Sequence, residues 1–257
     1  MKDIVFELIS SEKIAKNTYE WVLSGDTEGI RAGQFVNIKL DGFYLRRPIS
    51  VCNVKGNELT IIYKVVGKGT EKMAEMKPGE RLLVLTGLGN GYDLTKSGDT
   101  PLLIGGGAGV PPMYMLCLEL IREGKKPTVI LGFNTADEVF YKEQFESLGA
   151  RVIVATADGS MGVKGFVTDA MADVDYSYFY TCGPEPMLKA VYKTSVTSGQ
   201  FSFEERMGCG FGACMGCSCK VITGYKRICK DGPVLEKEEI LWYCRMQNAE
   251  CRIITPK

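Results

Sequence analysis

The cysteines near the C-terminus place the tightest limit on what this chain can fold into. Cys209, Cys214 and Cys217 lie in the stretch GCGFGACMGCSCK, and Cys229 follows a short way on. The chain has 257 residues with 10 cysteines and no histidine. The lack of histidine excludes a Cys/His zinc site, a Rieske centre and a histidine base. Nothing in the sequence points to export, so clustered cysteines are better explained by metal binding than by disulfides.

The spacing of these cysteines is typical of an iron–sulfur site. They follow C-x4-C-x2-C with a distant fourth cysteine, which is the plant-type [2Fe-2S] pattern. A zinc ribbon usually has two C-x-x-C pairs, and only Cys214 and Cys217 form one here. Neighbouring glycines let the backbone wrap closely and point its N–H groups inward. Structural zinc is the second interpretation, and reactive or disulfide-bonded cysteines are the third.

The other cysteines play no clear part in this pattern. Cys219 is a fifth candidate within the loop and could replace Cys229 as the fourth ligand, or it could be a spare thiol packed nearby. The rest are scattered, and each is better explained as a small buried apolar residue; they are Cys52, Cys117, Cys182, Cys244 and Cys251.

Composition and charge exclude several classes of function. Lys+Arg and Asp+Glu both number 31, so there is no basic excess of the kind that nucleic-acid-binding proteins carry. The most apolar helical segment, residues 110–121, is too short to cross a bilayer. The N-terminal stretch MKDIVFELIS contains acids and alternates like a strand, unlike a signal peptide. We therefore expect a cytoplasmic protein that binds neither nucleic acid nor membrane.

Hydrophobic periodicity divides the chain into three regions. Up to about residue 85, segments such as GQFVNIKL and ELTIIYKVV alternate and predict an antiparallel β-barrel. A short helix is expected from Thr70 to Met76, and residues 87–101 are typical of a linker. From Pro101, apolar strands alternate with helices expected over 110–123, 138–148 and 185–192. This alternation predicts a parallel sheet covered on both faces.

The third region is the tail, which begins at Phe201. It holds most of the cysteines and shows little periodicity. It is too short and too rich in loops to form an apolar core of its own. A bound metal could supply the missing stability.

Two short segments of the barrel region suggest a flavin site. Arg47-Pro48-Ile49-Ser50 has an R-x-x-S arrangement on a strand, in which Arg47 can pair with a diphosphate and Ser50 can bond the ring edge of a flavin. A solvated edge strand is the alternative. Gly69 and Thr70 open the short helix, where free N–H groups favour a phosphate. Thr70 could also be an ordinary N-cap.

Two further segments suggest a dinucleotide site. GGGAGVPP, residues 105–112, lies at a strand-to-helix turn, where glycines let a diphosphate approach the helix N-terminus. It is not a strict G-x-G-x-x-G motif because Val110 holds the last place, and a tight turn is the alternative. CGPEPM, residues 182–187, follows an apolar strand at the edge where open α/β sheets bind ligands. It could equally be a turn in which Pro184 begins a helix.

Together these motifs resemble the ferredoxin–NADP reductase superfamily and, within it, the electron-transfer subunits of type B dihydroorotate dehydrogenases. RPIS, GGGAGVPPM, DGSMGVKGFVTD, CGPEPM and CGFGACMGC…CKDGPV occur in that order and span essentially the whole chain. The resemblance implies three parts. They are a six-stranded antiparallel FAD-binding β-barrel over 1–98, a parallel-sheet α/β NAD-binding domain over 99–200, and a [2Fe-2S] cluster subdomain over 201–257.

The resemblance also implies which residues hold each cofactor. FAD would be held by Arg47, Pro48, Ile49, Ser50, Ile62, Tyr63, Lys64, Gly69 and Thr70. NAD(H) would be held by Gly105, Gly106, Gly107, Ala108, Gly109, Val110, Cys182, Gly183 and Pro184. The [2Fe-2S] cluster would be bound by Cys209, Cys214, Cys217 and Cys229. Ser50 and Cys182 would lie near the flavin edge and the nicotinamide, without acting as acid or base.

The activity implied by the resemblance is that of an oxidoreductase subunit. Electrons would pass from the FMN-containing dihydroorotate dehydrogenase catalytic subunit through the cluster and FAD to NAD+, in the synthesis of UMP. The two subunits would form a heterotetramer with two copies of each. Asn134 stands where related reductases often carry arginine, and no base lies between Gly132 and Asp137, which favours NAD over NADP.

Two alternatives remain open at this point. The chain could be a related FAD and [2Fe-2S] subunit that serves a sulfhydrogenase or a bifurcating ferredoxin–NADP+ oxidoreductase. It could also be no enzyme at all, but a nucleotide-binding module with a structural zinc site.

Overall fold

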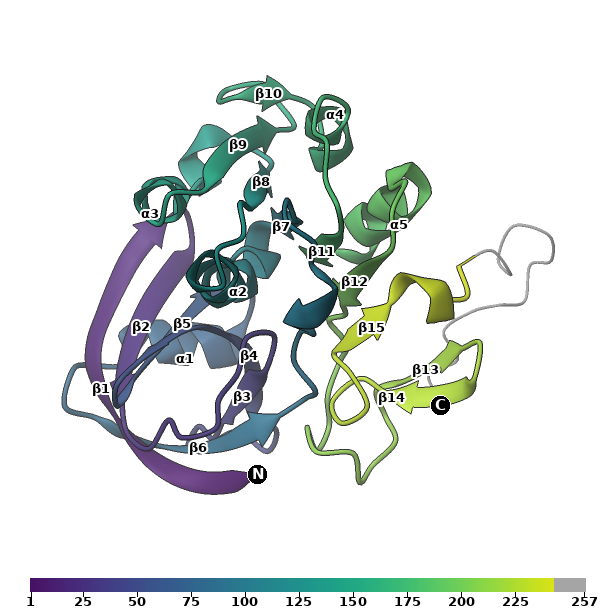
Figure 1. Ribbon diagram of the computed structural model, residues 1–257. Coiled ribbons are helices and arrows are strands. Elements are labelled where there is room, and N and C mark those ends of the chain that lie inside the picture. Colours follow the sequence, from purple (N-terminus) through teal and green to yellow (C-terminus); the bar gives the residue numbers. More distant parts are fainter. Residues whose placement is uncertain (243–257) are drawn as a thin grey trace.

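The N-terminal part of the chain forms the predicted closed antiparallel barrel, as the computed structural model shows (Figure 1). The structure describes residues 1–242. Six strands close in the order β1-β2-β5-β4-β3-β6. Their bounds are β1 Lys2–Ala15, β2 Thr18–Ser24, β3 Phe35–Ile38, β4 Arg47–Lys55, β5 Glu58–Lys64 and β6 Arg81–Leu88.

Alternation along these strands builds the barrel interior. Phe6 and Leu8 of β1, and Trp21 and Leu23 of β2, are all completely buried. Because successive side chains of a strand point to opposite faces, every second residue turns inward. Val36 of β3 follows the same rule, so its neighbours Phe35 and Asn37 lie on the outer face, toward the rest of the molecule.

Helix α1 (Lys68–Glu75) connects β5 to β6 and begins two residues earlier than predicted. Gly67 is its N-cap, so Gly69 and Thr70 both belong to the first turn. The Thr70 hydroxyl accepts hydrogen bonds from the backbone N–H groups of Val66 and Gly67 and donates to the Gly67 carbonyl. The alternative that Thr70 is the N-cap is therefore wrong, because it reaches back to the cap from the third helical position.

The second part is the predicted α/β domain with a parallel sheet. Its sheet order is β10-β9-β8-β7-β11-β12-β15, with β15 alone antiparallel to its neighbour. The strand bounds are β7 Leu102–Gly106, β8 Thr128–Phe133, β9 Arg151–Thr156, β10 Val163–Lys164, β11 Phe179–Cys182, β12 Gly199–Ser202 and β15 Val234–Glu236. The helices are α2 Pro111–Arg122, α3 Lys142–Ser147, α4 Val167–Met171 and α5 Glu185–Thr194.

Apolar side chains on both faces of the strands explain why helices cover this sheet on both sides. Leu103 of β7 packs with Leu116 of α2 and with barrel residues in one core cluster. Its neighbours Leu102 and Ile104 belong to a second cluster, together with Leu188 of α5. Helix α2 therefore lies between the sheet and the barrel, as Figure 1 shows. This packing joins the barrel to the α/β domain next to the turn between β7 and α2.

One predicted helix is shorter than expected. The segment predicted over 138–148 begins as a 3-10 turn, Ala136–Glu138, and becomes helical only at α3. Tyr141 interrupts it with a left-handed backbone conformation, φ +67°. Its hydroxyl donates a hydrogen bond of 2.5 Å to Glu20 of the barrel, so a tertiary contact overrides the local preference for helix.

Residues 87–101 are tied down on both sides, although their composition predicted a linker. Tyr92 is buried and packs edge-on against Tyr180 of β11, whose hydroxyl donates to the Asp93 carbonyl. A 3-10 turn, Leu94–Lys96, follows. Turn-forming residues indicated a loop correctly, but they gave no sign of what the loop contacts.

The tail packs on the edge of the α/β domain. A hairpin of β13 (Ser218–Val221) and β14 (Gly224–Arg227) precedes β15, and a 3-10 turn, Lys237–Glu239, follows it. The buried residues Ile228, Leu235 and Ile240 share a cluster with Phe201 of β12. The tail therefore has no core of its own, as expected, but it gains stability from the sheet. The predicted domain boundary at residue 200 falls inside β12.

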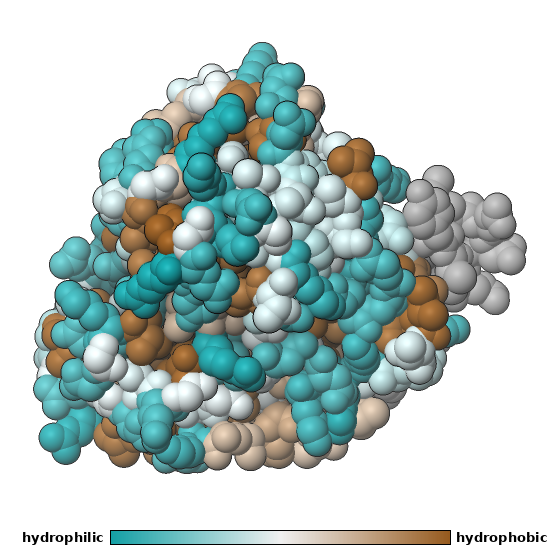
Figure 2. Space-filling model, viewed as in Figure 1, coloured by the Kyte–Doolittle hydropathy of each residue, from teal (hydrophilic) through white to brown (hydrophobic). Residues whose placement is uncertain are grey.

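Polar side chains cover most of the face shown in Figure 2, and the apolar ones gather in small groups between them. Among residues 1–242, no helix is both long enough and apolar enough to span a membrane.

Candidate cofactor-binding sites

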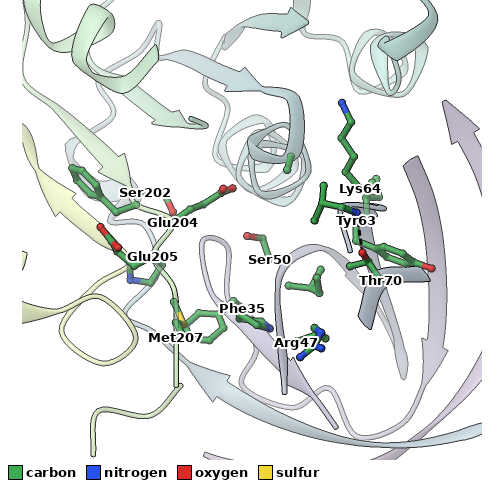
Figure 3. Close-up of a pocket in the computed structure, with 17 residues that line it drawn as sticks. Phe35, Arg47, Ser50, Tyr63, Lys64, Thr70, Ser202, Glu204, Glu205 and Met207 are labelled. Carbon is green, nitrogen blue, oxygen red and sulfur yellow. Dashed lines mark hydrogen bonds between the residues drawn. The ribbon is translucent and has the colours of Figure 1, made fainter. Parts of the chain in front are cut away.

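A cleft of about 400 Å³ opens where the barrel, the α/β domain and the start of the tail meet (Figure 3). Its lining includes eight of the nine residues predicted to hold FAD, which are Arg47, Pro48, Ile49, Ser50, Ile62, Tyr63, Lys64 and Thr70. Strands β4 and β5 and the first turn of α1 supply them. Most of the lining surface is apolar, with a few polar groups, which is typical of a cofactor site.

The ninth residue, Gly69, lies directly against Arg47. A β-carbon added at Gly69 would stand 1.8 Å from Arg47 Nε, so only glycine leaves room for the guanidinium. Arg47 Nη1 donates a hydrogen bond of 2.7 Å to the Leu45 carbonyl, and the guanidinium lies 4.7 Å from the ring centre of Phe43. These contacts hold a permanent positive charge beside the first turn of α1. Together they fit the diphosphate of a dinucleotide cofactor.

Ser50 lies deeper in the same cleft, and Figure 3 shows it near the centre of the lining residues. Within residues 1–242 no side chain or backbone group bonds its hydroxyl. The Tyr63 hydroxyl, which points away from Ser50 in Figure 3, is also buried without a partner in that part of the chain. Burial raises the pKa of Tyr63, so its phenol stays protonated. The Ser50 hydroxyl, without a partner beside an apolar wall, fits a flat ring with a polar edge, such as a flavin.

Lys64 differs from the other residues predicted to hold FAD, because its charged end points away from them. Its ammonium donates a hydrogen bond of 2.7 Å to Glu138 of the α/β domain. Figure 3 shows the side chain extending away from Arg47 and Ser50. This ion pair lowers the pKa of the Glu138 carboxyl. Lys64 therefore links the two domains while its chain forms part of the cleft wall.

Sequence reasoning missed about half of the cleft lining. The missed residues are Phe35, Val66, Ser202, Phe203, Glu204, Glu205, Met207 and Pro233. A usable signal existed, because Ser202 to Met207 run directly off the carboxyl end of β12, where open sheets place ligands. Ala108, predicted for NAD(H), also lines the cleft. The two predicted nucleotide sites therefore share a wall.

Glu204 is the acidic group of this missed segment whose pKa is displaced. Its side chain reaches solvent at the cleft mouth, while the protein around it desolvates the carboxyl and raises its pKa. Such a carboxyl holds a proton at higher pH than an ordinary glutamate does.

The structure brings together both predicted halves of the dinucleotide site. Strand β7 ends at Gly106, and the 3-10 turn Gly107–Gly109 leads into α2, which begins with Pro111. In the neighbouring strand, Cys182 pairs with Gly105. A β-carbon added at Gly109 would lie 2.2 Å from the Cys182 carbonyl oxygen. The glycine loop (residues 105–109) and the CGP turn (residues 182–184) therefore touch, as a shared binding site requires.

Val110 and Cys182 have structural surroundings that limit what they can do. Val110 is completely buried, which explains why an apolar residue replaces the last glycine of the motif. Cys182 is 1% exposed, and burial raises the pKa of its thiol. The thiol therefore stays neutral, which supports the prediction that Cys182 is neither an acid nor a base.

We expect Gly109→Ala to weaken both folding and NADH binding. The added methyl meets backbone atoms of Cys182 and Gly183, which cannot move aside as a flexible side chain can. Forced overpacking of this kind costs about 1–3 kcal/mol. Thermal unfolding of the purified chain and NADH titration measure the two effects. Unchanged stability and unchanged affinity would contradict the close packing of the two loops.

Acidic groups dominate the loops at the carboxyl ends of β8 and β9. Asn134 Nδ2 donates to Glu138 Oε2 at 3.0 Å, and the Asp158 backbone N–H donates to the Asn134 carbonyl. Asp137 forms an ion pair with Lys16 of the barrel. A small hollow of about 20 Å³ between Lys64, Ala108 and Glu138 shares lining residues, Lys64 and Ala108 among them, with the larger cleft.

The four predicted cluster ligands form two pairs. The backbone N–H groups of Ala213 and Cys214 point at Cys209 Sγ, at 3.2 and 3.4 Å. The Cys229 N–H points at Cys217 Sγ at 3.4 Å. Within residues 1–242 no three such groups surround a single point that could hold one metal ion. Two pairs of thiols fit two iron atoms with two thiolates each better than they fit one zinc ion.

The two pairs differ in exposure. Cys214 is exposed and Cys209 is half-buried, whereas Cys217 and Cys229 are 3% and 1% exposed. Burial opposes ionisation of Cys209, but the N–H groups around its sulfur lower the pKa of the thiol to about 6. These donors would also stabilise the negative charge of a bound cluster.

The remaining cysteines behave largely as predicted. Cys52 and Cys117 are buried, as small apolar residues should be. Cys219 lies on β13, and burial raises the pKa of its thiol to about 11. Cys244 and Cys251 lie outside the described residues.

An ion pair joins two parts of the segment that carries the four cysteines, residues 207–231, which we call the cluster segment. Arg227 donates two hydrogen bonds to Asp231, at 2.9 and 3.1 Å, and a third from Nη1 to the Gly212 carbonyl. Arg227 thereby connects the loop that carries the first three cysteines to the turn that carries Cys229. These contacts hold the two halves of the predicted cluster site together.

Two family models match the chain. Residues 103–193 match the oxidoreductase NAD-binding domain, and residues 204–241 match the iron–sulfur cluster binding domain of dihydroorotate dehydrogenase B. The first range contains the glycine loop and the CGP turn, and the second contains all four paired cysteines.

Curated relatives resemble the chain along almost its whole length. The dihydroorotate dehydrogenase B (NAD(+)) electron transfer subunit of Geobacillus sp. (strain WCH70) is 43% identical, over 94% of this chain and 99% of the relative. The subunit of the same description from Fusobacterium nucleatum is 46% identical, over 86% of this chain and 92% of the relative.

Solved structures confirm the fold. A chain from the structure of the NADH-dependent reduced ferredoxin-NADP oxidoreductase, described in work on flavin-based electron bifurcation, superposes with a TM-score of 0.85 at 30% identity. The match covers 93% of this chain and 90% of that one. Phthalate dioxygenase reductase superposes with a TM-score of 0.60 at 20% identity, over 75% and 64%, which shows the shared fold alone.

Proposed function

Because the chain belongs to the family of dihydroorotate dehydrogenase B electron transfer subunits, we propose that it carries electrons between a dihydroorotate-oxidising partner and NAD+. The partner is the FMN-containing catalytic subunit, and the complex contains two copies of each chain. The product of the complex, orotate, serves the synthesis of UMP. This chain works as an oxidoreductase subunit with FAD, a [2Fe-2S] cluster and NAD(H).

The observation that carries this proposal is the shared cleft. Ser50 from the barrel, Ala108 from the glycine loop and Met207 from the start of the cluster segment all line it. A flavin in this cleft would therefore face a dinucleotide on one side and the cluster segment on another. Bound flavin supplies the conversion between hydride transfer and single-electron transfer.

Each part of the chain has a separate task in this function. Arg47 and the first turn of α1 bind the FAD diphosphate, and Ser50 orients the ring edge. The glycine loop and the CGP turn hold the NAD(H) diphosphate at the start of α2. The four paired cysteines hold the cluster. The neutral Cys182 excludes water beside the nicotinamide without taking a proton.

The exposed pair of cysteines lies on the side of the cluster that a partner can reach. Phe211 and Met215, on either side of Cys214, are 42% and 49% exposed. Exposed apolar side chains around a buried centre are typical of an interaction surface. The catalytic subunit docks here, where electrons can enter the cluster without crossing the rest of the protein.

The nucleotide is NAD(H) rather than NADP(H). Asp137, Glu138 and Asp158 surround the loops after β8 and β9, and the nearby ammonium groups of Lys16 and Lys64 are held in ion pairs. A 2′-phosphate would meet these acidic groups, while the ammonium groups of Lys16 and Lys64 already have acidic partners. Like charges disfavour its binding.

Anaerobic purification with the catalytic subunit tests the proposal. We expect a coloured complex with FAD, FMN, two irons and two labile sulfides per chain pair, in keeping with a [2Fe-2S] centre. It should form orotate with NAD+ as acceptor, and this chain alone should reduce artificial acceptors with NADH. Protein that contains zinc and no flavin would favour the nucleotide-binding module instead.

A second candidate is supported by the match at 30% identity to the bifurcating oxidoreductase chain. In that case, the chain would co-purify with a partner that lacks dihydroorotate oxidation. Orotate formation by the purified complex separates the two, because only the first candidate predicts it.

A further inference from the structure

The connection between the barrel and the α/β domain makes contacts that cofactor binding does not explain. Its first residues are Gly89, Asn90 and Gly91, which follow β6. Both glycines have positive φ values, +79° and +76°. A β-carbon at Gly89 would lie 2.5 Å from Pro233 Cδ, and one at Gly91 would lie 2.8 Å from the Ala32 carbonyl oxygen. The connection is therefore pressed between the barrel and the tail.

Asn90 uses every hydrogen-bonding group on its side chain in this position. Its Nδ2 donates to the Val234 carbonyl at 2.7 Å and to the Asp231 carbonyl at 3.4 Å. Its Oδ1 accepts from the Val234 N–H at 3.1 Å. Its backbone N–H donates to the Gly232 carbonyl at 2.7 Å. One barrel-side residue thus bonds three of the four tail residues 231–234, namely Asp231, Gly232 and Val234.

These four residues lie between the cluster site and the flavin cleft. Asp231 follows the cluster ligand Cys229 by two positions, and Pro233 lines the cleft. The Pro233 carbonyl also accepts from the Phe203 N–H at 2.9 Å. Asn90 therefore fixes the short piece of chain that connects the buried pair of cysteines to the flavin wall.

The barrel contacts the other end of the cluster segment through Asn37. Asn37 is 1% exposed, and its Nδ2 lies 3.4 Å from the Cys209 carbonyl oxygen. Phe35, two residues earlier on the outer face of β3, lines the flavin cleft. Two residues of a strand span about 7 Å. Strand β3 therefore reaches the cleft through Phe35 and the first predicted cluster ligand, Cys209, through Asn37.

We propose that Asn90 is a positioning residue that clamps the segment after Cys229 to the flavin barrel and so sets the separation between flavin and cluster. The consequence for electron transfer rests on the proposed function. The rate of electron transfer falls steeply with distance, so a loosened segment would slow exchange between the two centres. The four cysteines and their N–H donors do not depend on Asn90.

Contacts other than those of Asn90 also hold the tail in the fold. β15 pairs with β12 along Gln200, Phe201 and Ser202. Lys96 forms an ion pair of 2.8 Å with Glu236. These contacts survive the loss of the Asn90 side chain, so an alanine variant should fold and should still retain its cofactors.

The test compares Asn90→Ala and Asn90→Asp with wild type, using full-length protein loaded with FAD and cluster. Asn57→Ala serves as a matched control, because its side-chain amide donates to the Ser24 hydroxyl at another turn of the barrel. Hydrogen exchange should show the Val234 amide opening about tenfold more often in Asn90→Ala, which corresponds to about 1.4 kcal/mol. Asn90→Asp keeps the acceptor for the Val234 N–H but places a carboxylate oxygen against the Val234 and Asp231 carbonyl oxygens, so it should not restore the protection.

Rapid mixing with NADH gives the second readout. In Asn90→Ala the flavin should bleach at the wild-type rate while cluster reduction slows severalfold, and the EPR spectrum of the cluster should not change. Unchanged cluster reduction, or equal slowing of both phases, would overturn the proposal. If wild-type protein binds no flavin or no cluster, the proposed function fails instead, and exchange at Val234 still reports whether the clamp exists.

Discussion

Cys229→Ser is expected to leave the protein without its [2Fe-2S] cluster, whereas Cys219→Ser should keep it. The Cys229 N–H points at Cys217 Sγ, so these two cysteines already form the buried pair that one iron needs. Cys219 lies two residues after Cys217, on β13, whereas the N–H groups that point at Cys209 Sγ and Cys217 Sγ belong to Ala213, Cys214 and Cys229. Iron and labile-sulfide assays after anaerobic purification, with visible and EPR spectra, measure the outcome.

The two serine variants are matched in chemistry and differ only in position. Both replace a mostly buried thiol with a hydroxyl of similar size, so a general loss of stability should affect them alike. If Cys219→Ser removed the cluster and Cys229→Ser kept it, the assignment of the fourth ligand would be wrong. A zinc-loaded, colourless wild-type protein would contradict the iron–sulfur centre itself.

Gly69→Ala is expected to weaken FAD binding about 10- to 100-fold with no loss of folding stability. The new methyl would occupy the position of the Arg47 guanidinium, 1.8 Å from its Nε, so this flexible side chain must swing away. Hydrogen bonds to charged groups contribute about 1.5–3 kcal/mol, and each 1.4 kcal/mol changes affinity tenfold. Alanine in place of glycine inside a helix favours folding by about 0.5–1 kcal/mol.

Gly67→Ala is the matched control for this prediction. Gly67 lies two residues away, has the extended φ of 171°, and a β-carbon there would meet nothing within 4 Å. FAD titration of both apo-proteins and their thermal unfolding separate binding from stability. Equal FAD affinity in Gly69→Ala and wild type would show that Arg47 does not bind the cofactor in the position seen here.

Local patterns predicted most of the helices and strands correctly. Alternation along β2 and β5 depends only on which side chains face inward, and the spacing of Cys209, Cys214 and Cys217 depends only on the ligand chemistry. The helix predicted over 138–148 failed for a different reason. Tyr141 leaves the helical conformation to bond Glu20, which is 121 residues earlier and invisible to any local pattern.

The chain's own order of residues was enough to determine the barrel, the parallel sheet, the two glycine-rich turns and the cysteine spacing. These features arise from short-range preferences that each segment carries with it. Packing between distant segments decided the rest: that Ala108 and Met207 share one cleft, that Lys64 pairs with Glu138, and that Asn90 bonds Asp231, Gly232 and Val234. Such contacts join residues many positions apart, and they exist only once the three parts have closed on one another.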